Sequence, residues 1–429
     1  MARLQTITGG REATTGVIPG RWALSVGNPR TQPVPGFRWT LLTHVARLES
    51  GHTPSRRKPE YWNGDIPWIG IRDATANHGR VIYSTNQSIT EEGVANSSTR
   101  VLPAGTVCLS RTASVGYVVT MGSPMATSQD FVNWFCGPEL LSRYLHYILV
   151  SEQESIRRFA HGSVHPTVYY PEAKAFYVCI PRPKEQAAIV AILGALDDKI
   201  AVNDRIAATT LALVDSIFDS IVAGIVPGPD TFGSVAEVFG GGTPRTSEPN
   251  HWDGVIAWTT PTDVTGLGSP YLFHTKRTIT ESGLDNCASR LNPAGSIFMT
   301  SRATIGAFAV PQIPAAVNQG FIVVVPPRRE LRWWLFHEMR SRLDEMISLA
   351  NGSTFLELSR KNFKTIPVRL GREGAISRFD AQANPLHERA AKGAEESKTL
   401  TKLRDAILPK LLSGEIRVRD AEKAVEEAT

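Results

Sequence analysis

The stretch GHTPSRRKPEYWNGDIPW at residues 51–68 recurs as GGTPRTSEPNHWDGVIAW at residues 241–258, 190 residues further along the chain. Without a gap, residues 51–131 and 241–321 are identical at 26 of 81 positions, far more than unrelated sequences share. Self-similarity over such a length indicates a duplication. The chain therefore contains one folding unit twice.

The shared residues are mainly glycines, prolines and aromatic residues. Pro103-Ala104-Gly105 and Pro293-Ala294-Gly295 each precede a short β-branched or apolar run, a pattern typical of a turn that leads into a strand. An Ile-Pro pair, Ile180-Pro181 or Ile366-Pro367, closes each copy. We expect each copy to be a β-rich mixed domain.

The first copy is followed by a segment that predicts one long helix, from Pro183 to about Ala223. Apolar or small residues alternate at intervals of four and three, which is the heptad spacing of a coiled coil. A helix of this length would span about 60 Å, more than a small domain needs for its core. The stripe consists of Ile189, Leu193, Leu196, Ile200, Asn203, Ala207, Thr210, Val214, Ile217 and Ile221.

A second helical stretch follows the second copy, from about Phe379 to Leu412. Its stripe contains Leu400, Leu403, Ile407 and Leu411, and Pro385 and Gly393 leave its start open. We expect the two helices to pair antiparallel within the chain, and Asn203 is the kind of polar seam residue that sets register. Pairing between two chains is the alternative.

Composition sets limits on the class of protein. The chain has 429 residues, 42% of them hydrophobic, and a net charge of +5, which is compatible with a polyanionic partner. Its four cysteines form no metal-ligand spacing, and we expect no metal site. Neither a signal peptide nor a membrane span is evident in the sequence, and we expect a cytoplasmic protein without a membrane partner.

The order domain–helix–domain–helix, with these motifs, resembles the specificity subunits of type I restriction-modification enzymes. In that family a target-recognition domain opens with G-x-T-P and a W-x-G-x-I-x-W segment, which stand here at residues 51–54 with 62–68 and at 241–244 with 252–258. The segment LRDAILPKLLSGEI at 403–416 is similar to the C-terminal signature of the family. The resemblance covers residues 37–418. Residues 1–36 have no counterpart in the second copy.

The fold class expected is therefore α+β, with two duplicated mixed α/β target-recognition domains separated by two long antiparallel coiled-coil helices. The expected divisions are an N-terminal extension at 1–36, a first recognition domain at 37–182, a central spacer helix at 183–225, a second recognition domain at 226–370, and a distal helix with a tail at 371–429.

The resemblance implies a sequence-specific DNA-binding subunit that is not itself an enzyme. Each domain would read one half of a bipartite site in double-stranded DNA. Two methyltransferase subunits would dock on the helices, and restriction-translocation subunits would complete the complex. The resemblance implies no cofactor on this chain, because S-adenosylmethionine, ATP and Mg²⁺ would act on the partner subunits.

Positions at which the copies differ, beside shared turns, are candidates for reading DNA. We expect surface loops at 55–58, 69–72 and 76–84 and at the matching positions of the second copy. Arginine and lysine suit guanine edges and phosphates. The predicted DNA-binding residues are Arg56, Arg57, Lys58, Arg72 and Arg111 in the first copy and Arg245, Thr246, Thr262 and Arg302 in the second.

Catalytic functions find little support in the sequence. Phe239-Gly240-Gly241-Gly242 is similar to a methyltransferase loop, but its counterpart in the first copy lacks the pattern, and the chain has no phosphate-binding GxxxxGK(S/T) loop. We predict no catalytic residue. The alternative function is a non-enzymatic protein-interaction scaffold with paired domains on a coiled-coil arm.

Overall fold

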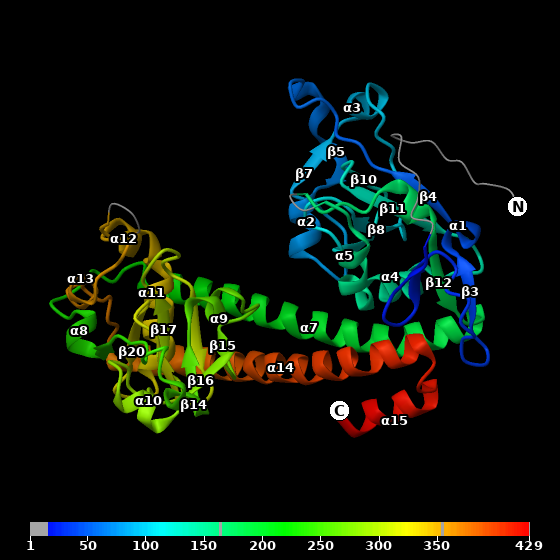
Figure 1. Cartoon of the computed structure of the whole chain (residues 1–429). Helices are drawn as coiled ribbons and strands as arrows, with labels where there is room; N and C mark the ends of the chain where they lie inside the picture. The colour runs from blue at the N-terminus through cyan, green and yellow to red at the C-terminus, as the bar shows by residue number, and fades with distance from the viewer. Residues whose placement is uncertain (1–15, 163–164, 353–355, 429) are drawn as a thin grey trace, which may run out of the picture. The chain divides into compact units, whose positions relative to one another are not determined.

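The computed structural model describes residues 16–162, 165–352 and 356–428 (Figure 1). The chain divides into two compact units, one formed by residues 1–197 with 400–429 and the other by residues 198–399. Each unit contains one β-rich domain together with part of each of two long helices. Of the predicted N-terminal extension, residues 1–15 lie outside the described residues.

The domain of the first unit is built on three sheets. A five-stranded sheet has the order β4-β11-β8-β9-β6, and a three-stranded sheet has the order β10-β5-β7. The third sheet, β1-β2-β12-β3, joins the two ends of the domain. The strands are β1 (Ile18–Pro19), β2 (Leu24–Val26), β3 (Arg38–Leu41), β4 (Ala46–Ser50), β5 (Trp62–Ile69), β6 (Arg80–Ile82), β7 (Gln87–Ile89), β8 (Val107–Ser110), β9 (Val118–Met121), β10 (Ala126–Thr127), β11 (Phe131–Cys136) and β12 (Phe176–Ile180). The helices are α1 (Leu42–Val45), η1 (Pro59–Tyr61), α2 (Ile71–Ala76), α3 (Glu91–Ala95), α4 (Ser142–Ser151), α5 (Gln153–Phe159) and α6 (Tyr170–Lys174).

The domain of the second unit repeats the first two sheets with the same topology, in the orders β13-β20-β17-β18-β15 and β19-β14-β16. The duplication inferred from the sequence is therefore a duplication of structure. The strands are β13 (Glu237–Phe239), β14 (Trp252–Thr259), β15 (Tyr271–Leu272), β16 (Arg277–Ile279), β17 (Ile297–Thr300), β18 (Phe308–Pro311), β19 (Ala315–Val317) and β20 (Phe321–Val325). The helices are α8 (Phe232–Val235), η2 (Pro249–His251), α9 (Pro261–Thr265), α10 (Glu281–Asp285), α11 (Leu331–Ser341), α12 (Leu343–Ser348) and α13 (Arg360–Lys364).

The two long helices are α7 (Pro183–Val222) and α14 (Glu373–Ser413), and a shorter helix, α15 (Val418–Ala428), follows them. The prediction for α7 is confirmed to within one residue. Helix α14 begins six residues before the predicted Phe379 and continues through Pro385 and Gly393. None of the helices in the described ranges is long and apolar enough to cross a bilayer.

The helices pair antiparallel within each unit, as predicted. In the first unit Asp197 of α7 accepts a hydrogen bond from Arg404 of α14 at 3.0 Å. In the second, Asn203 Nδ2 donates to Glu396 Oε2 at 2.9 Å. A Cβ at Gly393 would lie 3.3 Å from Asn203 Oδ1, so a glycine there gives the buried amide room. This contact explains why a helix-weakening glycine occurs within α14.

The buried stripe of α7 follows the predicted heptads for most of its length. From Ile189 to Val214 the predicted seam residues are buried or half-buried. At the C-terminal end, however, Phe218 and Val222 are buried in place of the predicted Ile217 and Ile221, which are only half-buried. An α-helix drifts relative to a strict heptad repeat, and here the drift turns Phe218 toward the second domain.

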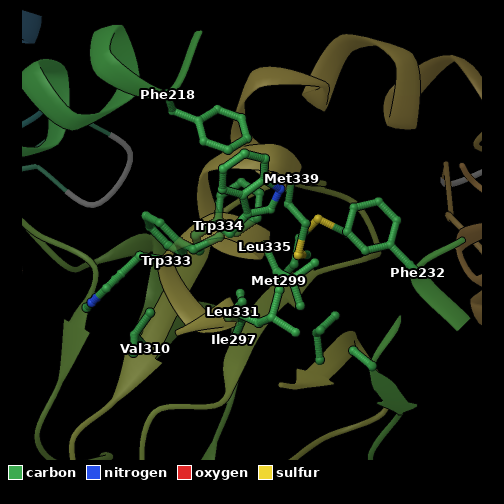
Figure 2. Close-up of a cluster of buried hydrophobic side chains, with 14 of the residues drawn as sticks. Phe218, Phe232, Ile297, Met299, Val310, Leu331, Trp333, Trp334, Leu335 and Met339 are labelled. Atoms are coloured by element: carbon green, nitrogen blue, oxygen red, sulfur yellow. The ribbon is translucent and has the colours of Figure 1, made fainter. Parts of the chain in front are cut away.

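Aromatic residues from both long helices complete the core of the second unit. Phe218 of α7 lies 5.2 Å, centroid to centroid, from Trp334 of α11 and 5.4 Å from Phe379 of α14 (Figure 2 shows Phe218 and Trp334). Phe232 and Phe363 stack at 4.6 Å at another side of this core. The helices are therefore structural parts of the domain core in this unit.

A polar network also connects both long helices to the second domain. His337 of α11 lies 2.6 Å from Asp215 of α7, its other nitrogen lies 2.9 Å from His387 of α14, and His387 lies 2.9 Å from the Tyr271 hydroxyl. One neutral tautomer of each histidine satisfies every contact, with each N–H or O–H donating toward Asp215. Trp333 stacks on His387 with centroids 3.5 Å apart.

The N-terminal extension is anchored by a buried carboxylate of the first domain. Strand β2 pairs with β12, and the carboxylate of Glu152 accepts hydrogen bonds from the backbone N–H groups of residues 21–24 at 2.5–3.2 Å. The second copy has Arg342 at the matching position. Among the described residues there, the corresponding chain ends meet through an isolated bridge between Thr231 and Pro367.

Glu152→Gln should destabilise the first unit. The amide retains one acceptor oxygen but loses the negative charge that four N–H groups share, and we expect a loss of roughly 1–3 kcal/mol in the free energy of unfolding. Urea unfolding measures it. Glu154→Gln is the control: this carboxylate is exposed and lies 3.7 Å from Arg21, so the change should cost less than about 1 kcal/mol. Equal effects of both changes would contradict the anchoring role.

The stability of the second unit should fall below about pH 6.5, the ordinary histidine pKa. Burial lowers the pKa of His387 to about 2 and also lowers that of His337. Both histidines therefore stay neutral in the folded chain but take up protons when it unfolds, and their contribution is lost as the pH falls from 6.5. In urea titrations from pH 7 to 4.5, His387→Phe should keep the stacking on Trp333 and flatten the slope. An unchanged slope would show that His387 is protonated in the folded chain.

Candidate nucleic-acid interface

A pair of tryptophans supports the same loop in each domain. Trp62 and Trp68 meet edge to face at 5.2 Å, and Trp252 and Trp258 do so at 5.0 Å. The indole N–H of the first tryptophan donates to the backbone oxygen of residue 55 or 245, and that of the second to residue 52 or 242. This loop, which has no identical residue between the copies at 55–58 and 245–248, is therefore held through its backbone.

A shared Thr–Gln contact joins this loop to a second turn. Thr53 Oγ1 donates to Gln129 Oε1 at 2.5 Å, and Thr243 Oγ1 donates to Gln319 Oε1 at 2.6 Å. In the first domain Arg111 Nε donates to the backbone oxygen of Gln129 at 3.1 Å. The two shared glutamines thus hold the surface segments together.

A shared aspartate shapes the segment after the second tryptophan. Asp73 Oδ2 accepts a hydrogen bond from Gly70 N, and Asp263 Oδ2 accepts one from Thr260 N. Each carboxylate caps a short helix, α2 or α9. The prediction of surface loops is therefore wrong for residues 71–72 and 76 and for residues 261–262, which belong to these helices, because the buried aspartate organises them. Residues 80–82 are also not a loop but strand β6, paired in parallel with β9.

The predicted DNA-binding residues of the first domain lie in three places. Arg56, Arg57 and Lys58 are exposed on the loop between the G-x-T-P turn and η1, and Lys58 forms an ion pair with Glu60 at 3.2 Å. That ion pair raises the pKa of Lys58. Arg72 is exposed on α2. Arg111 is half-buried, with its guanidinium 4.8 Å from the ring centroid of Tyr170.

In the second domain, two of the predicted residues line one groove. Thr262 and Arg302, together with Gln319, border a hollow of about 300 Å³. Arg302 forms an ion pair with Glu357 at 2.8 Å, so its charge is neutralised in the free chain. Arg245 and Thr246 are exposed on the loop held by Trp252 and lie outside the lining of this groove.

Arg111 and Arg302 are not structural equivalents. Isolated bridges pair Thr112 with Thr167 and Arg302 with Glu357, and both partners stand 190 residues apart. Ala113 and Ala303, which follow, both have a positive φ, of 60° and 58°. Arg302 therefore occupies the place of Thr112, one residue beyond the position equivalent to Arg111.

Arg277 of β16 is an exposed residue that was not among the DNA-binding residues predicted from the sequence. Its guanidinium lies 3.6 Å from the ring centroid of Trp252 and 5.8 Å from that of Trp258. The residue aligned with it in the first copy is Gln87, and the residue aligned with Arg56 is Thr246. A comparison of aligned positions therefore pointed to Thr246 and passed over Arg277.

Comparisons with known proteins agree with this architecture. The family model for the type I restriction modification DNA specificity domain matches residues 41–209 and 231–371. The MjaIX specificity subunit of Methanocaldococcus jannaschii is 26% identical over 406 residues, 88% of this chain and 93% of the relative. The EcoR124I/EcoR124II specificity subunit of Escherichia coli is 30% identical over 167 residues, 37% of this chain and 40% of the relative.

A solved structure, the type I restriction-modification S subunit of M. genitalium, has the same fold. Its TM-score is 0.57 at 16% identity, over 90% of this chain and 97% of that one. The class defined by the family model and the fold is thus a protein with two DNA specificity domains on paired helices. The chain belongs to the type I restriction-modification DNA specificity family, whose relatives named above are specificity subunits.

Glu357→Gln should strengthen DNA binding if Arg302 contacts DNA. The change releases Arg302 from its ion pair and should raise the affinity several-fold at low salt, whereas the fold should change little because both partners are more than 40% exposed. Fluorescence anisotropy with labelled duplex measures the affinity. Glu281→Gln, on exposed α10, makes the same change in net charge elsewhere in the domain. If both variants gain equally, Arg302 has no special role.

Proposed function

We propose that the chain reads a bipartite DNA sequence, with residues 37–182 recognising one half and residues 226–370 the other. The observation that carries this proposal is the combination of one framework with two different surfaces. The tryptophan pair, the Thr–Gln contact and the capping aspartate occur in both domains, whereas the exposed side chains around them differ. Two domains that share a fold but differ in their exposed side chains are suited to binding two different half-sites.

The exposed charges of these surfaces suit DNA. Arg56, Arg57 and Arg72 are exposed in the first domain, and Arg245 is exposed in the second. Arginines bind phosphate oxygens and guanine edges, so the same residues can position a duplex and read it. The groove with Thr262 and Arg302 adds hydrogen-bonding groups in the second domain.

The two long helices would then act as spacer and docking arm. Two methyltransferase subunits would bind along α7 and α14, and restriction-translocation subunits would complete the assembly. S-adenosylmethionine, ATP and Mg²⁺ would bind to those partner subunits. The complex would act in the cytoplasm, and this chain would select the DNA sites at which it acts.

A protein-interaction scaffold is the competing function. Binding to DNA through phosphates weakens steeply as salt rises because counterions are released on binding. Binding to a protein through apolar surface would be far less sensitive to salt. A salt titration of the assembled complex with DNA therefore separates the two functions.

The purified chain with its methyltransferase partner should select a split motif from random duplex DNA. Replacing Ser55–Lys58 by Arg-Thr-Ser-Glu, the second copy's own loop, should then alter one half of the motif only, because the framework holds this loop by its backbone. Selection followed by sequencing measures both halves. A selected pool without two separated blocks, or a loop exchange that changes both blocks, would contradict the proposal.

A further inference from the structure

The tryptophan pair of each domain lies beneath one arginine. In the first domain the guanidinium of Arg56 lies 4.4 Å from the centroid of Trp62 and 5.4 Å from that of Trp68. In the second, Arg277 lies 3.6 Å and 5.8 Å from the matching rings. Both guanidinium groups lie within cation–π distance of two indoles.

The two arginines come from different positions of the repeat. Arg56 belongs to the loop before η1, and Arg277 belongs to strand β16. The positions are nevertheless neighbours in space, because Arg56 Nη2 donates to Gln87 Oε1 at 3.0 Å, and Gln87 is the residue aligned with Arg277. Each domain therefore has one arginine over its tryptophan pair. In the first domain it comes from the loop position, and in the second it comes from the neighbouring strand position.

These arginines also differ from other arginines stacked on aromatic rings nearby. Arg290 lies 3.9 Å from the ring of Phe239, but Glu237 is within 4.0 Å of it, and its counterpart Arg100 pairs with Glu49 at 2.8 Å. Within the described part of the chain, neither Arg56 nor Arg277 forms an ion pair with a carboxylate. Each is an exposed cation whose orientation is restricted by the rings and whose charge is left for a partner.

We propose that Arg56 and Arg277 are equivalent DNA contacts, one for each domain, held over the tryptophan pair so that the outer N–H groups bind acceptors of the duplex. This inference rests on the proposed function. It moves the role predicted for Thr246 to Arg277. The guanidinium group of each arginine presents several N–H donors in a fixed planar arrangement. Their acceptors in DNA are either phosphate oxygens or the O6 and N7 atoms of guanine.

Restoring the charge from the other position tests the equivalence directly. With the full chain, its methyltransferase partner and the selected duplex, R277Q should weaken binding about tenfold or more, and T246R/R277Q should recover most of the loss. In the first domain R56T should weaken binding and R56T/Q87R should restore it. R290Q is the matched control, because it removes a ring-stacked arginine that already has a carboxylate partner. Thermal unfolding confirms that each variant is folded.

The replacement R277K distinguishes the two acceptors. A phosphate contact predicts that lysine keeps most of the affinity and that R277Q lowers the salt slope by about one, with both half-site preferences unchanged. A guanine contact predicts that R277K relaxes one position of one half-site. Either result supports the proposal.

Two kinds of result would overturn this inference alone. In the first, R277Q binds the duplex as tightly as the wild type, or no more weakly than R290Q does. In the second, R277Q or R56T weakens binding, but the arginine added in T246R/R277Q or R56T/Q87R does not restore it. Failure of the wild-type complex to bind any duplex would instead overturn the proposed function, and this inference with it.

Discussion

A carboxylate on α7 in each unit fixes how a recognition domain packs on the helices. Asp197 accepts hydrogen bonds from Arg143 and Tyr147 of α4 and from Arg404 of α14, at 2.6–3.0 Å. Asp215 is held by His337 and by two nitrogens of Arg340. Burial alone would raise the pKa of Asp215, but these donors lower it to about 2, so the group stays charged. Both carboxylates are partly buried, with 14% of the Asp197 side chain and 29% of the Asp215 side chain exposed, so removing one of these partners should be costly.

This constraint explains features that apolar packing leaves open. Tyr147 and His337 stand 190 residues apart, so the duplication kept a hydrogen-bonding aromatic residue at one place in the domain helix. Each meets a different aspartate of the same helix, because α7 leaves the first domain and enters the second. The heptad stripe allows several registers to bury similar apolar area, whereas a carboxylate satisfied in only one arrangement selects among them.

The sequence predicted the parts of the fold that depend on local pattern. The duplicated blocks predicted two copies of one topology, and the four-three spacing located α7 from Pro183 to Val222. It could not predict contacts between distant residues. Glu152 binds the backbone of residues 21–24, which lie about 130 positions earlier in the chain. The close approach of Asn203 explains why residue 393 is a glycine. The early start of α14 is accompanied by packing of its first turn, in which Ile376 is buried in the core of the second unit. The surface contacts were harder to predict than the core. Arg277 aligns with a glutamine in the first copy, and only the folded structure shows that it lies over Trp252.

The variable surface depends on a framework in which several shared side chains bond to backbone atoms. Besides the indole N–H groups, Thr90 donates to the backbone oxygen of Glu60 at 2.8 Å, and Thr280 donates to that of Asn250 at 2.7 Å. The residues that accept these bonds differ between the copies, yet the bonds are the same, because every residue carries a carbonyl oxygen. Side chains in this loop can therefore change without loss of a framework contact. The atoms that hold this loop are thus separate from the exposed side chains that differ between the two domains.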